Sequence, residues 1–254
     1  MAAPAVAVVT GAGSPSGIGY ATALALGQAG LLRVVASTTE RIHERARELQ
    51  AQGIAARGVV ADLTDPAGVQ ALQQAAETAG RVDVLVNNAG MAVLGVMDAP
   101  GDLADLAPAD WQRSLERNLT TAYLVTRAFL PGLKARGYGR IVNVASTTGP
   151  VAAVRGDTAY AAAKAGLVGF TRAVALEAAA SGVTVNAVAP GWIATGSQSP
   201  REAAAGARTP LQRSGTPAEI AAVVAFLASR GAAYVTGQLV VADGGNSIVE
   251  DHNA

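Results

Sequence analysis

The strongest constraint on the fold is an alternation of short apolar segments with longer segments of helical length. The short segments are rich in valine, isoleucine and alanine; they are Ala5–Val9, Arg33–Ser37, Gly58–Asp62, Val82–Asn88, Arg140–Ser146, Val183–Ala189 and Gln238–Gly244. Helices are expected over Gly17–Ala29, Thr39–Gln52, Pro66–Ala79, Pro108–Arg136, Ala159–Ser181 and Pro217–Arg230. Strands that are apolar on both faces and separated by helices indicate a parallel sheet covered on both sides. The sequence therefore predicts an α/β chain with a doubly wound, parallel seven-stranded sheet and helices on both faces.

The composition indicates one large soluble domain. Half of the 254 residues are hydrophobic and 15% are charged, and no linker or low-complexity segment divides the chain, so we expect a single domain over residues 1–254. Nineteen basic and nineteen acidic residues cancel, which excludes the positive field that a nucleic-acid or anionic-lipid partner requires. The N-terminal segment lacks the basic lead of a signal peptide, and no apolar stretch reaches membrane-spanning length. We therefore expect a cytoplasmic protein without membrane or nucleic-acid partners.

The absence of cysteine and the presence of only two histidines limit the catalytic mechanisms that this chain can use. Cysteine is absent, which excludes disulfides, thiolate catalysis and cysteine-ligated metals. The two histidines, His43 and His252, lie in a charged stretch and near the C-terminal end, and both are expected to be solvated. We expect no metal site and no Ser-His-Asp triad. A reaction on this chain must use a cofactor or the side chains of Tyr, Lys, Ser, Asp or Glu.

A glycine-rich turn, TGAGSPSGIG (Thr10–Gly19), connects the first predicted strand to the first helix. The residues expected to contact a phosphate there are Gly11, Ser14, Ser16, Gly17, Ile18 and Gly19. Glycines allow a sharp turn and a close approach of the backbone, and the helix N-terminus offers N–H groups to a pyrophosphate. The spacing departs from G-x-G-x-x-G because Ser16 stands where the third glycine is required. We interpret the turn as a lengthened dinucleotide site of a Rossmann fold.

The end of the second predicted strand bears on the choice of cofactor. Thr38 stands where an acidic residue would bind the ribose hydroxyls of NAD. Ser37, Thr38, Thr39 and Arg41 can instead donate hydrogen bonds to a 2′-phosphate, which favours NADP(H). Glu40 keeps NAD(H) open as the alternative, and the Ser-Thr-Thr run is also typical of a helix N-cap.

Tyr160 and Lys164, in YAAAK, share one face of a predicted helix at spacing i,i+4. Free tyrosine has a pKa near 10, too high for proton exchange at neutral pH. An ammonium about 5 Å away contributes roughly 3 kcal/mol at an effective dielectric of about 20, enough to lower that pKa by about two units. The pair is therefore suited to acid–base work, although the same spacing also occurs on solvated helix surfaces.

Several motifs occur in order along the chain: the glycine-rich turn, NNAG at 87–90, NVAS ending at Ser146, YAAAK at 160–164 and APG at 189–191. In this respect the chain resembles the single-domain branch of the short-chain dehydrogenase/reductase family, over Val6 to Gly245. It is especially similar to 3-oxoacyl-[acyl-carrier-protein] reductases and related ketone reductases. The stretches PLQRSGTPAEIAAVVAFLAS and YVTGQLVVADGG are typical of that subgroup.

The resemblance implies roles for individual residues. Tyr160 would be the general acid/base, Ser146 would position the substrate oxygen, and Lys164 would bind the nicotinamide ribose and lower the pKa of Tyr160. Asn118 would hold a water of the proton relay. The further cofactor contacts that the resemblance implies are Asp62, Leu63, Asn88, Ala89, Gly90, Pro190, Gly191, Ile193 and Thr195.

The implied activity is an NADP(H)-dependent carbonyl reductase or secondary alcohol dehydrogenase, acting on 3-oxoacyl groups or other small ketones. An NAD-dependent alcohol dehydrogenase and a nucleotide-binding scaffold without turnover are the alternatives. The family also implies a homotetramer, or a homodimer, built through the helices that contain Asn118 and Tyr160 and through the C-terminal strand region.

The chain departs from the family pattern in two places. Five residues, Ala12 to Ser16, separate the first glycine of the turn from GIG, where the family has three. Ser146 and Tyr160 are fourteen positions apart, about one more than the subgroup pattern. The extra residue falls in VAAVRGDT, where Arg155 or Asp157 can reach substrate if the loop is not simply exposed. A small lid is expected at 195–210, where Arg201 and Arg208 are expected to be solvated.

Overall fold

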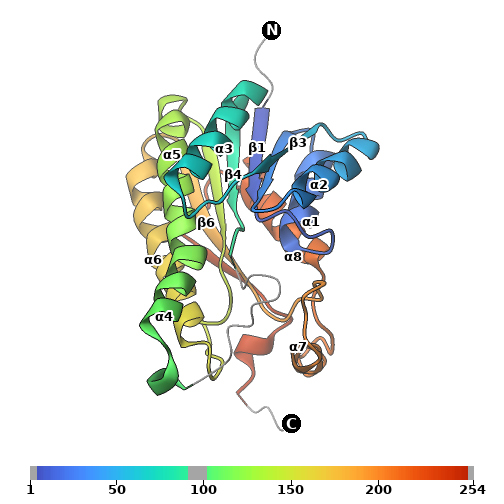
Figure 1. Cartoon of the computed structure of the whole chain (residues 1–254), viewed down its shortest axis with the longest axis vertical. Coiled ribbons are helices and arrows are strands. Elements are labelled where there is room, and N and C mark those ends of the chain that lie inside the picture. Colours follow the sequence, from blue (N-terminus) through green and yellow to red (C-terminus); the bar gives the residue numbers. More distant parts are fainter. Residues whose placement is uncertain (1–4, 91–101, 251–254) are drawn as a thin grey trace.

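The computed structural model describes residues 5–90 and 102–250. These residues form a parallel sheet of seven strands, as predicted (Figure 1). The strand order is β3-β2-β1-β4-β5-β6-β7. The strands are β1 (Ala5–Thr10), β2 (Leu32–Ser37), β3 (Ala56–Val60), β4 (Arg81–Asn87), β5 (Gly139–Val144), β6 (Val183–Pro190) and β7 (Leu239–Ala242). The prediction of a single domain over residues 1–254 includes residues 1–4, 91–101 and 251–254, which lie outside the described residues, and stays a prediction.

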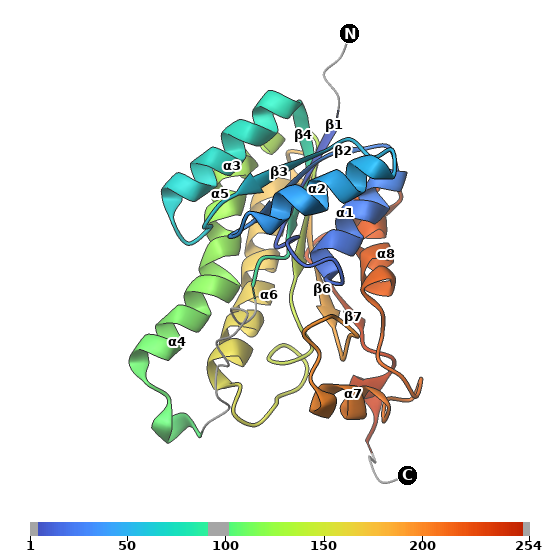
Figure 2. The ribbon, with the colours of Figure 1, turned by 45° about the vertical axis from the view of Figure 1, so that its right-hand side comes forward.

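Helices cover both faces of the sheet (Figures 1 and 2). On one face lie α1 (Ile18–Gln28), α2 (Arg41–Ala51) and α8 (Pro217–Ala228). On the other face lie α3 (Pro66–Ala79), α5 (Thr121–Ala135) and α6 (Thr158–Ala179), and α4 (Pro108–Leu115) packs against α6. A short helix, α7 (Pro200–Gly206), lies apart from these layers, beyond the ends of the strands (Figure 2). No helix in the described ranges is both long and apolar enough to cross a lipid bilayer.

The core shows why the strands carry apolar residues at successive positions. In β1, Val6 and Val8 belong to the cluster beneath α3, α5 and α6, whereas Ala7 and Val9 belong to the cluster beneath α1, α2 and α8. All four side chains are fully buried. Because side chains alternate across a strand, a sheet covered on both faces needs apolar residues at odd and even positions alike. The same pattern made these segments recognisable in the sequence.

The helix predicted over Pro108–Arg136 is interrupted. A π-helical turn, Glu116–Thr120, separates α4 from α5. Such a turn takes up one extra residue within a helix and occurs frequently at functional sites. The difference matters for function because Asn118 lies inside this turn.

Candidate active site

Asn88, directly after β4, holds the glycine-rich turn that follows β1. Its Nδ2 donates hydrogen bonds to the carbonyl oxygens of Thr10 and Gly11, at 3.1 and 3.0 Å. The backbone N–H groups of Asn88 and Ala89 each donate to Thr10 Oγ1 at 3.0 Å. Gly11 has a φ of +68°, and a Cβ there would lie 2.8 Å from the Ala89 backbone. The turn is thus fixed between β1 and β4, where the strand order reverses and where doubly wound sheets bind ligands.

The start of α1, which follows the lengthened part of the turn, has no side-chain cap among the described residues. Gly17 is the N-cap of α1. The Gly17 N–H donates to the Ser14 carbonyl at 3.2 Å, which closes the added loop. Ser16 is exposed, and its Oγ lies against the position that a Cβ on Gly196 would take. Uncapped N–H groups at the positive end of a helix dipole suit a pyrophosphate, so the residues present fit a dinucleotide.

The segment after β2 presents hydroxyl groups rather than a carboxylate. Thr38 and Thr39 are exposed, the Ser37 hydroxyl donates to the Thr39 carbonyl at 3.0 Å, and Arg41 Nε donates to Thr39 Oγ1 at 3.4 Å. The interpretation of Ser37–Thr39 as a helix cap is wrong, because α2 begins at Arg41 and its N-cap is Glu40.

The carboxylate of Glu40 contacts the side chain of His43. One of its carboxylate oxygens lies 3.3 Å from His43 Nε2. His43 is exposed, as predicted, and His252 lies outside the described residues.

The loop after β3 contains two predicted cofactor contacts, and only one of them has an accessible side chain. Asp62 is exposed, and its Oδ1 accepts hydrogen bonds from the Thr64 N–H at 2.9 Å and from the Thr64 hydroxyl at 2.7 Å. Leu63 is buried in the core cluster beneath α3. A ligand at this edge can therefore reach Leu63 only through its backbone.

Ser146, Tyr160 and Lys164 line one cavity of about 750 Å³. Ser146 follows β5, whereas Tyr160 and Lys164 lie one turn apart on α6. The Ser146 hydroxyl lies close enough to the Tyr160 hydroxyl to favour its ionised form. Lys164 Nζ donates to the Val144 carbonyl at 3.0 Å and lies 5.6 Å from the centre of the Tyr160 ring. A carbonyl oxygen in this cavity can meet two hydroxyl donors with an ammonium close behind them.

The pKa values in this group differ from the expectation drawn from the sequence. Burial raises the pKa of Tyr160 to about 12, the Ser146 hydroxyl opposes that rise, and the charges of Asp157 and Glu202 add to it. Burial also lowers the pKa of Lys164 to about 8. The expected lowering of the Tyr160 pKa by Lys164 is not found in the chain by itself. The reason is that burial disfavours the charged form of both groups.

Asn118 and Lys164 meet at Gly90. A Cβ on Gly90 would lie 2.9 Å from Asn118 Oδ1 and 3.4 Å from Lys164 Nζ. Asn118 is buried, and its Nδ2 donates to the Ser114 carbonyl at 3.1 Å. The π-helical turn and the end of β4 thus bring three sequence-predicted residues to one point beside Tyr160.

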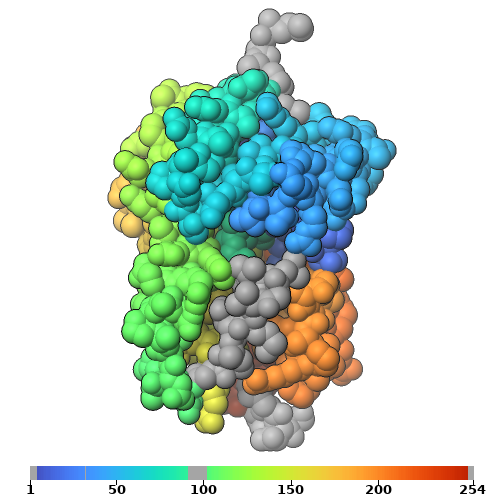
Figure 3. Space-filling model, viewed as in Figure 1, coloured from blue at the N-terminus to red at the C-terminus, as the bar shows by residue number. Residues whose placement is uncertain are grey.

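The segment after β6 forms the opposite wall of the cavity. Four predicted residues of this segment line it, namely Pro190, Gly191, Ile193 and Thr195. The predicted lid (residues 195–210), called the lid segment below, contains α7, which the sequence did not reveal. In Figure 3 the green surface of α4 and the orange surface of the lid segment lie on opposite sides of the lower half of the molecule. The lid segment and the α4 side thus stand across from each other at one end of the sheet.

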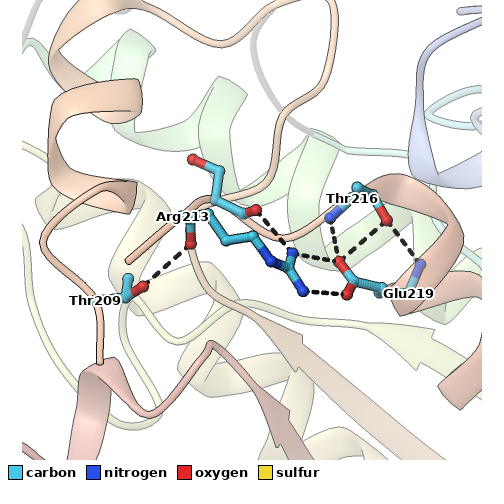
Figure 4. Close-up of polar contacts among 5 residues, drawn as sticks. Thr209, Arg213, Thr216 and Glu219 are labelled. Carbon is cyan, nitrogen blue, oxygen red and sulfur yellow. Dashed lines mark hydrogen bonds and ion pairs between the residues drawn. The ribbon is translucent and has the colours of Figure 1, made fainter. Parts of the chain in front are cut away.

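Polar contacts hold the residues on either side of the lid segment. At its base, the Gly215 N–H donates to the Trp192 carbonyl at 2.9 Å, and the Ala194 N–H donates to the Gly215 carbonyl at 2.8 Å. Arg213 then forms two hydrogen bonds with the Glu219 carboxylate of α8, at 2.9 and 2.6 Å (Figure 4). The pKa of Glu219 is lowered to about 2 by Arg213 and by two hydrogen bonds from Thr216.

Sequence reasoning missed much of the cavity wall. The polar wall residues that it did not assign include Ser114, Asp110 and Arg113 of α4, together with Trp192, Gln198, Glu202 and Asn246. Asp157 lines the cavity, so the exposed-loop interpretation is wrong for that residue and holds for exposed Arg155. Arg201 and Arg208 are exposed, as predicted. Within residues 5–90 and 102–250, no three His, Asp or Glu side chains are grouped as they would be around a metal ion.

Known proteins are similar to this chain in sequence and fold over almost its whole length. The family model described as "Enoyl-(Acyl carrier protein) reductase" matches residues 11–247. The chain is 41% identical to the 3-oxoacyl-[acyl-carrier-protein] reductase FabG of Pseudomonas aeruginosa, over 94% of this chain and 96% of the relative. It is also 41% identical to the cis-4-hydroxycyclohexanecarboxylate dehydrogenase of Sinomonas cyclohexanicum, over 96% and 97% of the two chains.

A solved structure agrees with these matches. The crystal structure of a variant actinorhodin polyketide ketoreductase with NADPH superposes with a TM-score of 0.88 at 39% identity, covering 98% of this chain and 100% of the other. The sheet order, the sequence matches and this superposition establish that the chain belongs to the short-chain dehydrogenase/reductase family of oxidoreductases.

Proposed function

We propose that the protein is an NADP(H)-dependent carbonyl reductase and secondary alcohol dehydrogenase in which Tyr160 transfers the proton. The observation that carries this proposal is that Ser146 and Tyr160 share the wall of one cavity of about 750 Å³, with Lys164 Nζ 5.6 Å from the Tyr160 ring. A nicotinamide, when bound, supplies or accepts the hydride, and the protein orients and polarises the substrate.

In the direction of reduction, Ser146 and Tyr160 bind the substrate carbonyl oxygen and increase the positive charge on its carbon. The carbonyl carbon takes up a hydride, and the oxygen takes the Tyr160 proton, so that a secondary alcohol forms. Oxidation of the alcohol runs the same steps backwards, with the tyrosinate as the base.

Lys164 has two tasks in this proposal. Its Nζ donates one hydrogen bond to the Val144 carbonyl, at 3.0 Å. Because an ammonium has three N–H donors, two remain for the nicotinamide ribose. Its charge would oppose the burial that raises the pKa of Tyr160. Asn118, beside Lys164 at Gly90, would hold the water that returns a proton to Tyr160.

The cofactor preference rests on the segment after β2. Exposed Thr38 and Thr39 place hydroxyl donors where a carboxylate would bind the ribose of NAD, and Arg41 lies beside Thr39. The pairing of Glu40 with His43 draws that carboxylate toward α2. Both features favour NADP(H), and the ketoreductase of the matching fold is described with NADPH.

The proposed substrates are 3-oxoacyl groups or other small ketones. The FabG relative, whose name specifies 3-oxoacyl-[acyl-carrier-protein] reduction, supports this class. The second candidate is an NAD-dependent alcohol dehydrogenase. The relative named cis-4-hydroxycyclohexanecarboxylate dehydrogenase supports action on alcohols. A comparison of NADH and NADPH binding separates the two.

We also propose a homotetramer in the cytoplasm. Large apolar side chains are exposed on α5 (Tyr123) and α6 (Leu176), and on α8 (Phe226) and β7 (Val241). Two such faces would allow two different dimer contacts, which a tetramer requires. Light scattering coupled to size-exclusion chromatography gives the mass that decides this point.

The decisive experiment replaces Tyr160 by Phe, which removes only the hydroxyl. We expect turnover of ketones to fall by at least about a thousandfold, while NADPH binding, followed by fluorescence, is retained. Near-normal turnover in a variant that binds NADPH would refute the role of Tyr160. A wild-type protein that binds NADPH and reduces no ketone in a broad absorbance screen would instead support the scaffold alternative.

A further inference from the structure

The cavity wall around Tyr160 carries more negative than positive charge. Its charged residues are four carboxylates and two cations, namely Asp105, Asp110, Asp157, Glu202, Arg113 and Lys164. Arg113 is ion-paired with Asp110, and Lys164 is assigned to the cofactor in the proposed function. The described part of the wall therefore presents a substrate with more carboxylates than cations.

Asp157 and Glu202 are the carboxylates whose charge reaches the reacting group. Asp157 directly precedes α6, three positions before Tyr160, and Glu202 belongs to α7 in the lid segment. Both charges raise the pKa of the Tyr160 hydroxyl. The Ser199 N–H donates to Glu202 Oε2 at 2.6 Å, which fixes the orientation of that carboxylate. Within the described ranges, no ion pair neutralises Glu202.

A buried hydroxyl in the same wall independently indicates a polar ligand. Ser114 of α4 lines the cavity, and its side chain is 7% exposed. Its Oγ has no hydrogen-bond partner among the described residues. A buried hydroxyl without a partner costs free energy, so a polar group of the ligand or a bound water is expected to meet it.

We propose that the substrate is a ketone or secondary alcohol that also carries a cationic amine, which Glu202 and Asp157 attract, and that the cavity disfavours substrates that carry a carboxylate. This inference rests on the proposed function and specifies its substrate class. A cation between two carboxylates in a partly desolvated cavity is stabilised, whereas an anion there is both desolvated and repelled. Because Glu202 lies on the lid segment, a bound cation also draws that segment toward the loop that contains Asp157.

The test uses three pentan-2-ones that differ only at carbon 5, which carries a trimethylammonium, a tert-butyl or a carboxylate group. The first two are nearly isosteric, so their comparison isolates charge. We expect kcat/KM with NADPH to be about tenfold higher for the ammonium than for the tert-butyl ketone, and about tenfold lower for the carboxylate. Glu202→Gln and Asp157→Asn should each reduce the ammonium-to-carboxylate ratio by about fivefold. Glu177→Gln, the same charge change at an exposed position near the far end of α6, should leave the ratio unchanged.

The outcomes separate this inference from the proposed function. If none of the three ketones and no ketone of the broad screen is reduced, the proposed function itself is wrong. If ketones are reduced but the ammonium ketone is not preferred over the carboxylate, the substrate inference is overturned while the function stands. A preference that survives both carboxylate substitutions would overturn the assignment to Glu202 and Asp157.

A second measurement needs no variant and therefore does not depend on folding of the variants. Benzyltrimethylammonium should inhibit the wild-type protein competitively against the tert-butyl ketone, and phenylacetate should inhibit at least about tenfold more weakly. Equal inhibition by both would overturn the inference.

Discussion

The side-chain amide of Asn88 donates a hydrogen bond to the carbonyl oxygen of Gly11, 3.0 Å away. The same nitrogen reaches the Thr10 carbonyl, and a Cβ on Gly19 would lie 2.5 Å from it. One amide after β4 therefore binds the start of the turn that connects β1 to α1 and lies against Gly19 at its end. The extra residues of the turn lie between these two points, so its added length does not displace the start of α1.

Replacement of Asn88 by Ala should release the glycine-rich turn. Two backbone carbonyls lose their donor, and we expect the free energy of unfolding to fall by about 1–3 kcal/mol. NADPH affinity should fall by about tenfold, because the helix N–H groups are no longer held in place. Thermal melting and fluorescence titration measure the two effects. Gln70→Ala, which removes an exposed amide on α3, is the control and should change neither quantity.

Replacement of Lys164 by Met should stabilise the fold and abolish turnover. Because burial lowers the pKa of Lys164 to about 8, the unfolded chain binds more protons between pH 8 and about 10.5, and protonation disfavours the native state below that range. Methionine removes this penalty but leaves the Val144 carbonyl without its donor, so we expect a net gain of about 1 kcal/mol at pH 7. Denaturant unfolding at pH 7 and pH 10 checks the sign, since the gain should shrink at the higher pH. A destabilised variant at pH 7 would contradict the argument.

Replacement of Thr38 by Asp should turn the cofactor preference toward NAD(H). A carboxylate at this exposed position repels a 2′-phosphate and accepts hydrogen bonds from the ribose hydroxyls. We expect the NADPH-to-NADH ratio of kcat/KM to fall by at least about tenfold. Thr38→Asn, which has the same size without the charge, should retain most of the preference. If the wild-type protein already prefers NADH, the interpretation of this segment is wrong.

Neutralising Glu202 should move the pH dependence of alcohol oxidation. A nearby carboxylate disfavours the tyrosinate and so raises the pKa of Tyr160, and its removal lowers that pKa. Oxidation needs the tyrosinate as base, so the rate of Glu202→Gln should begin to rise at a lower pH than that of the wild-type protein. Asp157→Asn should act in the same direction. A shift to higher pH, measured in kcat/KM with an uncharged alcohol, would be inconsistent with this cause.

Replacement of Arg213 by Ala should loosen the end of the lid segment. The variant loses both hydrogen bonds to Glu219 but keeps the Thr216–Glu219 capping box of α8. We expect KM for ketones to rise several-fold, faster proteolytic cleavage within residues 195–210, and little change in NADPH affinity. Arg201→Ala, at an exposed position on α7, serves as the matched control. Equal cleavage rates in the two variants would show that the ion pair does not hold the lid segment.

The sheet and most of the candidate site were predictable because they depend on local patterns. Apolar runs buried on both faces gave the seven strands, and the one-turn spacing of Tyr160 and Lys164 placed both on the same helix. Ser146, which the family resemblance picked out before the structure placed it, lies at the same cavity because parallel strands end at one edge of the sheet.

The residues that were missed depend on tertiary contacts or on short elements. Glu202 and Tyr160 are far apart in sequence, and only the fold brings the charge of Glu202 to Tyr160. The π-helical turn at Glu116–Thr120 adds one residue to a long helix. The hydrophobic periodicity is judged over many residues, so one added residue does not show in it. α7 has seven residues, too few for a periodic signal, although the Ser199–Glu202 capping box was visible in the sequence.

The base of the lid segment has an evolutionary consequence. Because the backbone of Gly215 bonds to Trp192 and Ala194, the chain enters and leaves this segment at nearly the same point. A loop whose ends already meet can be exchanged or lengthened at a small entropic cost and without disturbing the strands. The lid segment can therefore be replaced as a unit. A new substrate specificity can arise by changes within residues 195–210, while the strands of the sheet keep their sequence.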